Sequence, residues 1–141
     1  MGPLGHSVAA LTALVSAPVF GAAMCLRPAW RVGWRERLGR VSCEAPASLW
    51  VHAASLGETR AALPLARALA DHGESIYLSH TRADALDIGF DLQGSLVGRG
   101  VAPFDHPWCS GRALDRVSPR AVVLVETELW PSGIRAAIDR G

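Results

Sequence analysis

The chain has 141 residues, half of which are hydrophobic, and its formal net charge is +1. This length is enough for one domain of ordinary size and is short for two. Attraction to nucleic-acid phosphates requires a marked basic excess, so with this near-neutral charge we expect no nucleic-acid partner.

The first predicted element is a membrane anchor over residues 1–26, which carry no fixed side-chain charge. Within it, VAALTALVSAPVFGAAMCL provides 19 residues. As a helix this run would extend roughly 28 Å, close to the thickness of a bilayer's hydrocarbon core. Pro18 would kink the helix, and MGPLGHSV lacks the basic residues with which a secretory signal begins. We interpret the segment as a retained anchor, and the alternatives are a cleaved signal or a buried helix.

A basic segment over residues 27–47 follows the predicted anchor. It contains five arginines and only two glutamates. Arginine-rich flanks of membrane segments remain on the cytoplasmic side, and Trp30 and Trp34 suit the membrane interface, where tryptophan is enriched. We therefore expect the rest of the chain to face the cytoplasm.

From residue 48 onward, apolar runs alternate with helical patterns. The predicted strands are Leu49–Ala53, Ser75–His80, Ser95–Pro103 and Arg120–Glu126. The predicted helices begin at Ser55, Trp108 and Pro131. The first is ended by Gly73 as its C′ residue, the second runs to Val117 and the third to the last residue. Strands that alternate with helices imply parallel βαβ units, so we predict an α/β fold with a Rossmann-like parallel sheet over residues 48–141.

The predicted strands differ in strength. Arg120–Glu126 is a continuous β-branched run of the kind that is buried on both faces of a sheet. Ser95–Pro103 is weakened by its glycines. The chain closes on AIDRG, a helix end where the next strand of such a sheet would begin, so we expect a truncated domain.

Glu58 lies where the first predicted strand gives way to a helix. Ser55 and Glu58 have the S-x-x-E spacing of a capping box, in which both side chains bond to backbone N–H groups of the first helical turn. A catalytic carboxylate is the alternative. Gly57 favours this alternative, because a glycine in the first turn permits close approach of a ligand to the backbone. Both interpretations stay open at this point.

The second acidic cluster is VETELWP, with Glu126 at the carboxyl end of the last predicted strand. Ligands of open α/β sheets bind at such strand ends. With the usual strand order 3-2-1-4, the first and last strands are neighbours, so Glu58 and Glu126 would converge. Two carboxylates together suit general-base chemistry near neutral pH. The alternative is a solvated strand end on which Glu126 and Glu128 are incidental.

The cysteines and histidines do not indicate a disulfide framework or a metal site. Cys25, Cys43 and Cys109 are an odd number without C-x-x-C spacing, so we interpret them as buried or inert thiols. The five histidines lack metal-ligand spacing with carboxylates or thiols, and we expect no metal and no cofactor. His52 is the one histidine of interest, because it would end the first strand close to Glu58.

Four segments together resemble one protein family. WVHAASLGETRAALPLARAL and VVLVETELWPSGI, with APFDHPW between them and WRERLGR before them, resemble the 3-deoxy-D-manno-octulosonic acid (Kdo) transferases of lipopolysaccharide assembly. The resemblance covers nearly the whole chain, and the H-x-x-S-x-G-E and E-T-E-L-W-P motifs are specific in combination. It implies a glycosyltransferase of the GT-B fold with two Rossmann-like domains, of which this chain matches the first.

The resemblance also implies a chemistry. Glu58 would be the general base that deprotonates a hydroxyl of the acceptor sugar, and Glu126 would stabilise the transition state. The acceptor would be a lipid A precursor, and the CMP-Kdo donor would bind chiefly to the second, missing domain. The enzyme would act at the inner membrane with its catalytic domain in the cytoplasm. The substrate-binding residues that we assign on this basis are Ser55, Gly57, Thr81, Asp105 and Glu128.

Two segments depart from the family's pattern. Members have a threonine-rich T-x-T-x-T-G segment after the second strand, whereas this chain has SHTRADALDIG, which keeps Thr81 and adds Arg82 and Asp84. PFDHPW has Phe104 in place of the family's tyrosine and keeps Asp105. The first departure bears on acceptor recognition, and it leaves a diverged paralogue as an alternative.

Two rival functions belong to other classes. One is a non-catalytic, membrane-tethered domain that binds acceptor lipid or a partner without turnover. The other is a periplasmic α/β binding protein, which would require cleavage after the apolar segment. A second α/β domain encoded after Gly141 would favour the enzyme, and the mass of the mature chain would test the periplasmic alternative.

Overall fold

The computed structural model describes residues 31–83, 92, 94–126 and 129–141. The chain divides into two compact units, Met1–Trp34 and Arg35–Gly141, of which the second contains the sheet. The predicted membrane anchor lies outside the described residues. Within the described ranges, no helix is both long enough and apolar enough to cross a bilayer.

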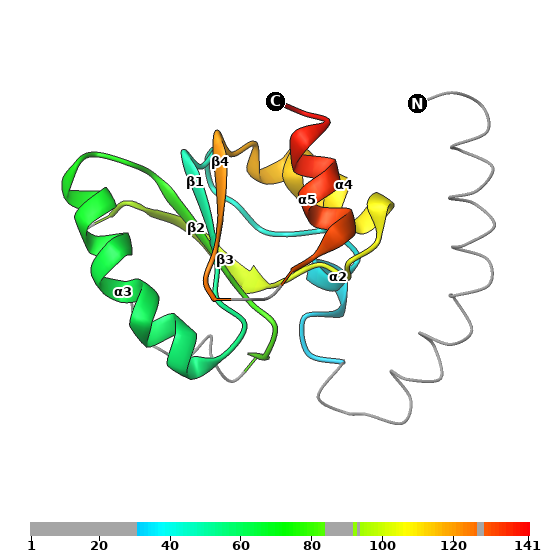
Figure 1. Ribbon diagram of the computed structural model, residues 1–141, viewed down its shortest axis with the longest axis horizontal. Helices are drawn as coiled ribbons and strands as arrows, with labels where there is room; N and C mark the ends of the chain where they lie inside the picture. Colours follow the sequence, from blue (N-terminus) through cyan, green and yellow to red (C-terminus); the bar gives the residue numbers. More distant parts are fainter. Residues whose placement is uncertain (1–30, 84–91, 93, 127–128) are drawn as a thin grey trace. The chain divides into compact units, whose positions relative to one another are not determined.

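Four parallel strands form the sheet in the order β3-β2-β1-β4 (Figure 1). They are β1 Leu49–His52, β2 Ile76–His80, β3 Leu96–Val101 and β4 Ala121–Leu124. The predicted α/β class and the predicted strand order are both confirmed. β1 lies at the centre of the sheet, between β2 and β4.

Helices cover both faces of this sheet. They are α3 Leu56–Asp71, α4 Pro107–Val117 and α5 Pro131–Ile138, and the short helix α2 Trp34–Arg37 precedes the first strand. α3 packs on one face, whereas α4 and α5 pack on the other (Figure 1). This arrangement is the one expected of a parallel sheet, whose faces are both buried by its crossover helices.

α3 ends where the sequence predicts it to end. Gly73 has a φ of 81°, a conformation that glycine adopts without strain. Its N–H bonds to the carbonyl of Ala70 at 2.9 Å, and the N–H of Glu74 bonds to the carbonyl of Leu69 at 3.1 Å. These two bonds form a Schellman motif, which satisfies carbonyl groups that the last helical turn leaves unpaired.

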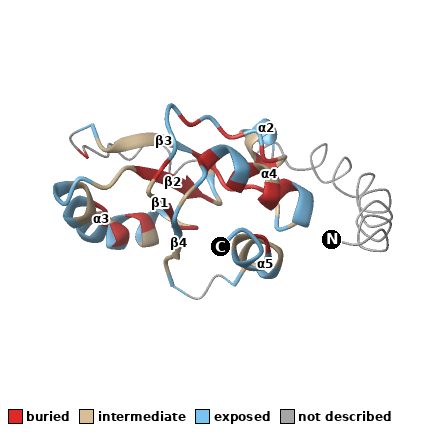
Figure 2. Cartoon of the chain, turned by 90° about the horizontal axis from the view of Figure 1, so that it is seen from above, coloured by how far each residue is buried: buried red, intermediate tan, exposed pale blue. Residues whose placement is uncertain are grey.

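Alternate residues along the strands pack into two apolar clusters, one on each face of the sheet. Trp50 of β1 and Tyr77 of β2 face α4 and α5, and their rings meet edge to face with centroids 5.4 Å apart. Val51 and Leu78, the next residues along the same strands, face α3. Figure 2 shows the buried residues concentrated on the strands and on the inner sides of the helices.

β4 corrects one prediction about burial. Its apolar run predicts burial on both faces, but Ala121 is exposed and the rest of the strand is only half-buried. The reason is its position, because β4 pairs with β1 on one side and is the edge strand of the sheet in the described part of the chain. Composition therefore predicts the strand but not its place in the sheet.

The glycines of β3 make room for a tyrosine. A Cβ atom at Gly98 would lie 2.9 Å from the ring of Tyr77 and 2.7 Å from the backbone oxygen of Ser42. One at Gly100 would lie 2.9 Å from the hydroxyl oxygen of Tyr77. These distances are shorter than van der Waals contact, so the strand needs glycine where Tyr77 crosses it.

Two residues of the predicted basic segment contact the carboxyl edge of the sheet. Glu36 Oε2 accepts a hydrogen bond of 2.6 Å from the N–H of Val101, at the end of β3. Arg37 is buried, and its Nη2 donates to the carbonyl of Thr81 at 3.1 Å. Its guanidinium also lies over the ring of Phe104, 5.8 Å from the centroid. This segment therefore helps to hold the loops that follow β2 and β3.

Candidate active site

The structure places the predicted site residues after the four strands of the sheet. Glu58 lies in the first turn of α3, which follows β1, and Thr81 directly follows β2. Asp105 lies between β3 and α4, and Glu126 follows β4. Glu128 lies outside the described residues. Because parallel strands end at a common edge, these described residues share the edge where ligands of open α/β sheets bind.

Two hydrogen bonds orient the carboxylate of Glu58. The backbone N–H of Ala54 donates to Oε2 at 2.7 Å, and the hydroxyl of Ser55 donates to Oε1 at 3.1 Å. The Ser55 oxygen in turn accepts from the backbone N–H of Glu58 at 3.2 Å. The half-buried glutamate is therefore fixed by residues 53–59, the connection after β1 together with the first turn of α3, which we call the Glu58 turn.

The predicted helix cap is confirmed, with one difference. Ser55 is the N-cap of α3 and bonds the N–H three residues later, as a capping box requires. In that motif the glutamate bonds back to the N–H of the N-cap residue, whereas Glu58 bonds to the N–H of Ala54, one residue earlier. A carboxylate offers roughly four lone-pair sites, so these two hydrogen bonds leave acceptor capacity for a further group.

Gly57 is exposed in the first turn of α3, and the space above it is open. A Cβ atom at this position would find its nearest neighbour in the Ser55 oxygen, at 3.9 Å, which is an ordinary contact distance. Packing within the described residues therefore does not require glycine here. An open backbone of this kind permits the close approach of a ligand.

Glu126 has a backbone conformation that residues other than glycine rarely adopt. Its φ is 64°, and the residue is exposed. The N–H of Val125 donates to the carbonyl of His52 at 2.9 Å, so the contact between β4 and β1 continues up to the residue before Glu126. The predicted proximity of the two strands is confirmed, and the convergence of Glu58 and Glu126 on one ligand stays a prediction.

Asp105 and Thr81 both make contacts within the fold. Asp105 Oδ1 accepts a hydrogen bond of 2.9 Å from the N–H of Gly133, in the first turn of α5. The N-cap residue of α5, Trp130, provides no side-chain cap, so Asp105 supplies one from another loop. Thr81 accepts from Arg37 through its carbonyl, and its buried hydroxyl oxygen has no hydrogen-bond partner among the described residues.

Two buried side chains that the sequence does not single out link the Glu58 turn to the end of β2. His80, at the end of β2, is 1% exposed, and Thr59 of α3 is fully buried. His80 Nδ1 lies 2.9 Å from Thr59 Oγ1 and 3.2 Å from the carbonyl oxygen of Ala53. Burial lowers the pKa of His80, which keeps its imidazole neutral at neutral pH. No spacing rule links residues 59 and 80, because only the pairing of β1 with β2 brings them together.

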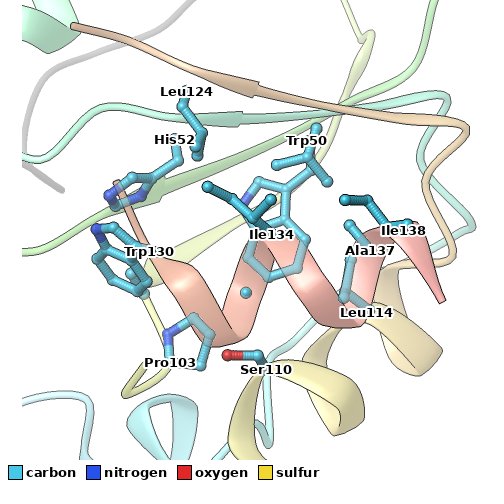
Figure 3. Close-up of a pocket in the computed structure, with 13 residues that line it drawn as sticks. Trp50, His52, Pro103, Ser110, Leu114, Leu124, Trp130, Ile134, Ala137 and Ile138 are labelled. Carbon is cyan, nitrogen blue, oxygen red and sulfur yellow. The ribbon is translucent and has the colours of Figure 1, made fainter. Parts of the chain in front are cut away.

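His52 faces the side of the sheet that α5 covers, where it lines a cavity of about 200 Å³ (Figure 3). Its Nδ1 lies 2.9 Å from Ser79 Oγ, and its ring meets that of Trp130 edge to face at 4.6 Å. The rest of the lining is mainly apolar and includes Trp50, Pro103, Leu114, Leu124 and Ile134. His52, the last residue of β1, and Trp130, the N-cap residue of α5, are thus the part of the lining that lies at the carboxyl edge of the sheet.

Cys43 and Cys109, the two cysteines in the part of the chain that the structure describes, are not suited to act as nucleophiles. Burial raises the pKa of Cys43 and raises that of Cys109 to about 11, so both stay protonated at neutral pH. The prediction of buried thiols is confirmed for these two, and Cys25 lies outside the described residues. Over the ranges that the structure describes, no group of three or more His, Cys, Asp or Glu side chains could hold a metal ion.

Comparison with known proteins gives consistent matches. A family model for "3-Deoxy-D-manno-octulosonic-acid transferase (kdotransferase)" matches residues 32–141. A 3-deoxy-D-manno-octulosonic acid transferase of Bordetella pertussis is 42% identical over 121 residues, which cover 79% of this chain and 28% of the relative. A protein of Arabidopsis thaliana, a "Probable 3-deoxy-D-manno-octulosonic acid transferase, mitochondrial", is 34% identical over 108 residues, or 74% of this chain and 24% of the relative.

A third relative, a 3-deoxy-D-manno-octulosonic acid transferase of Haemophilus influenzae, is 34% identical over 112 residues, or 74% of this chain and 26% of the relative. The chain spans about a quarter of the length of these curated relatives. The range matched by the family model includes all four strands and both acidic motifs of the carboxyl edge. This chain therefore belongs to the 3-deoxy-D-manno-octulosonic acid transferase family.

Proposed function

We propose that the chain is the acceptor-side part of a glycosyltransferase that moves Kdo from CMP-Kdo to a lipid A precursor in lipopolysaccharide synthesis. Membership of the family supports the reaction. The observation that carries the proposal for this chain is the Glu58 carboxylate, oriented by two hydrogen bonds beside the end of the central strand. Donor binding is assigned to a second domain of the same GT-B enzyme.

In the proposed reaction, a hydroxyl of the acceptor sugar attacks the anomeric carbon of Kdo. The new carbon–oxygen bond forms while the bond between that carbon and the phosphate oxygen of CMP breaks, and CMP leaves with the bonding electron pair. Glu58 accepts the hydroxyl proton as the general base. The bonds from Ala54 and Ser55 support this role, because they orient the carboxylate and leave it acceptor capacity.

Glu126 is proposed to stabilise the transition state from the neighbouring strand end. Departure of CMP develops positive charge at the anomeric centre, and a preorganised carboxylate lowers the energy of such a charge. The left-handed backbone of Glu126 supports this assignment. A strained conformation costs of order 1–3 kcal/mol, and such conformations cluster at active sites.

Substrate contacts are proposed for Ser55, Gly57, Thr81, Asp105 and Glu128. The open backbone at Gly57 supports its part in this set. The buried Thr81 hydroxyl, which lacks a hydrogen-bond partner among the described residues, is a group that a bound acceptor could satisfy. Ser55 would act mainly through its bond to the catalytic carboxylate, and Asp105 would combine substrate contact with its cap on α5.

The proposed location is the inner membrane, with residues 1–26 as the anchor and the catalytic domain in the cytoplasm. An uncharged segment followed by an arginine-rich one supports this orientation. A membrane-bound enzyme would also meet its lipid acceptor within the bilayer in which that acceptor is dissolved.

The test joins residues 1–141 to the remaining part of the Bordetella pertussis relative and measures Kdo transfer from CMP-Kdo to a lipid A precursor. We expect the chimera to transfer Kdo, and we expect Glu58→Gln to lower kcat by roughly 10²–10⁴-fold. Its thermal midpoint should change by only a few degrees, because the amide keeps the length of the side chain and an acceptor oxygen. Glu126→Gln should lose less activity, and Glu44→Gln, an exposed glutamate away from the edge, is the matched control.

Three outcomes would contradict parts of this proposal. Full activity in Glu58→Gln would show that Glu58 is not the general base, and its role in the cap of α3 would be the one that remains. A folded chimera that binds CMP-Kdo and transfers nothing would favour the non-catalytic domain that binds acceptor lipid or a partner. Residues 1–141 alone should be inactive, because they would not hold the donor in line with the attacking hydroxyl. Transfer by these residues alone would contradict the assignment of the donor to a second domain.

A further inference from the structure

A buried imidazole attaches the side chains and backbone of the Glu58 turn to β2. His80 reaches both ends of the turn, the carbonyl of Ala53 at its start and the hydroxyl of Thr59 at its end. The backbone supports the same contact, because the N–H of Ala53 donates to the carbonyl of Ser79 at 3.0 Å. The turn therefore depends on the end of β2 for its position, although it follows β1 in the chain.

The hydrogen-bond partners of His80 indicate which nitrogen of its neutral ring carries the hydrogen. The carbonyl of Ala53 can only accept, and the Thr59 hydroxyl already donates to the carbonyl of Ser55 at 2.8 Å. Both partners are thus acceptors toward His80, so Nδ1 carries the hydrogen and shares it between them. The neutral ring that burial favours has the tautomer that this geometry requires.

We infer that His80 is a positioning residue for Glu58. His80 bonds the turn at Ala53 and at Thr59. The two groups that orient the Glu58 carboxylate, the Ala54 N–H and the Ser55 hydroxyl, lie between these residues along the chain. A shift of the turn would move the carboxylate with it. The catalytic consequence rests on the proposed role of Glu58 as the base, whereas the orientation of the carboxylate does not depend on that role.

A side chain that only fills space would not need these bonds. An apolar residue would occupy the same volume without the cost of removing an imidazole from water, and that cost is recovered only through hydrogen bonds. Misplacement of a catalytic group by about 1 Å can lower a rate by roughly 10²-fold. The two roles therefore predict different effects, a loss of stability alone for a filler and a loss of carboxylate orientation for a positioning residue.

The experiment compares His80→Leu with His80→Asn, whose side-chain amide places an N–H near the position of Nδ1. The first readout is the amide resonance of Ala54 in the full 141-residue chain in detergent micelles, followed while the Glu58 carboxylate is titrated. The second is kcat and the acceptor KM in the chimera described above. His72→Leu, the same change at an exposed histidine at the carboxyl end of α3, is the control.

We expect His80→Leu to abolish the response of the Ala54 amide to the carboxylate and to lower kcat by at least about tenfold, with acceptor KM changed by less than about threefold. His80→Asn should keep the amide response and stay within about threefold of the wild-type kcat. An unchanged Ala54 response in His80→Leu would overturn the inference. Equal impairment of the Asn and Leu variants would also overturn the inference, because an N–H donor near the position of Nδ1 would then make no difference.

Thr59→Val keeps the inference testable if His80→Leu does not fold. It preserves the shape of the side chain and removes the hydroxyl that His80 bonds. We expect it to weaken the Ala54 response in the same direction, and an unchanged response would overturn the inference. The amide readout needs no turnover, so it separates the two proposals. Activity retained in Glu58→Gln together with a His80-dependent amide response would refute the base and leave the positioning role.

Discussion

Gly57 offers a substitution that separates folding from binding. Its φ is not left-handed and the space around it is open, so alanine fits the folded backbone. We expect Gly57→Ala to raise the free energy of unfolding by about 0.4–1 kcal/mol, because alanine restricts the unfolded chain. The acceptor KM should rise in the chimera, because the new methyl group occupies the space that a ligand needs at the backbone. Urea denaturation and steady-state kinetics measure the two effects.

Gly73 is the matched control at the other end of the same helix. Its surroundings are equally open, but its φ of 81° strains any other residue. Gly73→Ala should therefore destabilise the protein by about 1 kcal/mol, with no effect on KM. A more stable Gly57→Ala variant with an unchanged acceptor KM would show that the acceptor does not approach this backbone.

His80 should make the stability of the protein depend on pH. Burial lowers the pKa of its imidazole from the ordinary value of 6.5, Arg99 acts in the same direction, and the bond to Ala53 opposes them. As the pH falls through about 6.5, the unfolded chain binds a proton that the folded protein does not, so the free energy of unfolding decreases. The decrease ends once the pH is below the pKa of the folded state.

Urea denaturation from about pH 7.5 to about pH 5.5 tests this dependence. Wild type should lose stability relative to His80→Asn as the pH falls, because the variant lacks the titrating ring. Leu65→Asn, an exposed substitution on α3, introduces the same side chain without removing a titrating group and should follow wild type. Parallel curves for wild type and His80→Asn would contradict the prediction.

At the scale of elements, α5 depends on a cap from another loop. Its first helical residue is Pro131, which lacks an N–H, and its N-cap residue Trp130 provides no side-chain acceptor. The carboxylate of Asp105 bonds the N–H of Gly133 instead. An anion at this position also interacts favourably with the helix dipole. This hydrogen bond therefore links the loop after β3 to the first turn of α5.

Removal of this cap should weaken the start of α5. We expect Asp105→Ala to lower the free energy of unfolding by about 0.5–1 kcal/mol, the lower part of the range for N-caps, because Asp105 is exposed. Asp105→Asn keeps an acceptor oxygen and should lose less. Amide hydrogen exchange in α5, together with urea denaturation, measures the effect.

Asp71→Ala is the control for the Asp105 variants. Asp71 is an exposed acid in the last turn of α3, where a negative charge opposes the helix dipole, so its removal should be neutral or slightly stabilising. If Asp105→Ala matched wild type in both measurements, the hydrogen bond to Gly133 would have no energetic role.

At the scale of the whole molecule, the predicted orientation in the membrane can be measured with reporters fused after Gly141. We expect a cytoplasmic reporter such as β-galactosidase to be active and alkaline phosphatase, which requires the periplasm, to be inactive. The physical reason is the arginine-rich segment after the uncharged residues 1–26. Activity of alkaline phosphatase alone would contradict the predicted orientation.

A charge variant provides the control for the reporter experiment. Arg27→Gln combined with Arg31→Gln reduces the positive charge next to the predicted anchor and should increase the periplasmic fraction. Arg37 should be left unchanged, because it is buried and bonds the Thr81 carbonyl, so its loss would disturb the carboxyl edge as well as the charge.

The sequence determined the features that depend on residues close together in the chain. Strand and helix periodicities predicted the order of the elements, and the confirmed strand order follows the usual pattern of such folds. The three-residue spacing of Ser55 and Glu58 predicted the cap, and Gly73 predicted the end of α3. The motifs at the carboxyl edge indicated the family to which the chain belongs.

Tertiary structure alone decided the contacts that support this edge. Thr59 and His80 are 21 residues apart, and Asp105 and Gly133 are 28 residues apart. Tertiary structure also decided how far β4 is buried. An apolar run predicts a strand, but the neighbours of that strand in the sheet determine how much of it is covered. Periodicity and capping act within one element, whereas strand order and register determine which distant side chains meet. The hydrogen bonds from His80 to the Glu58 turn therefore form only once β2 has paired with β1.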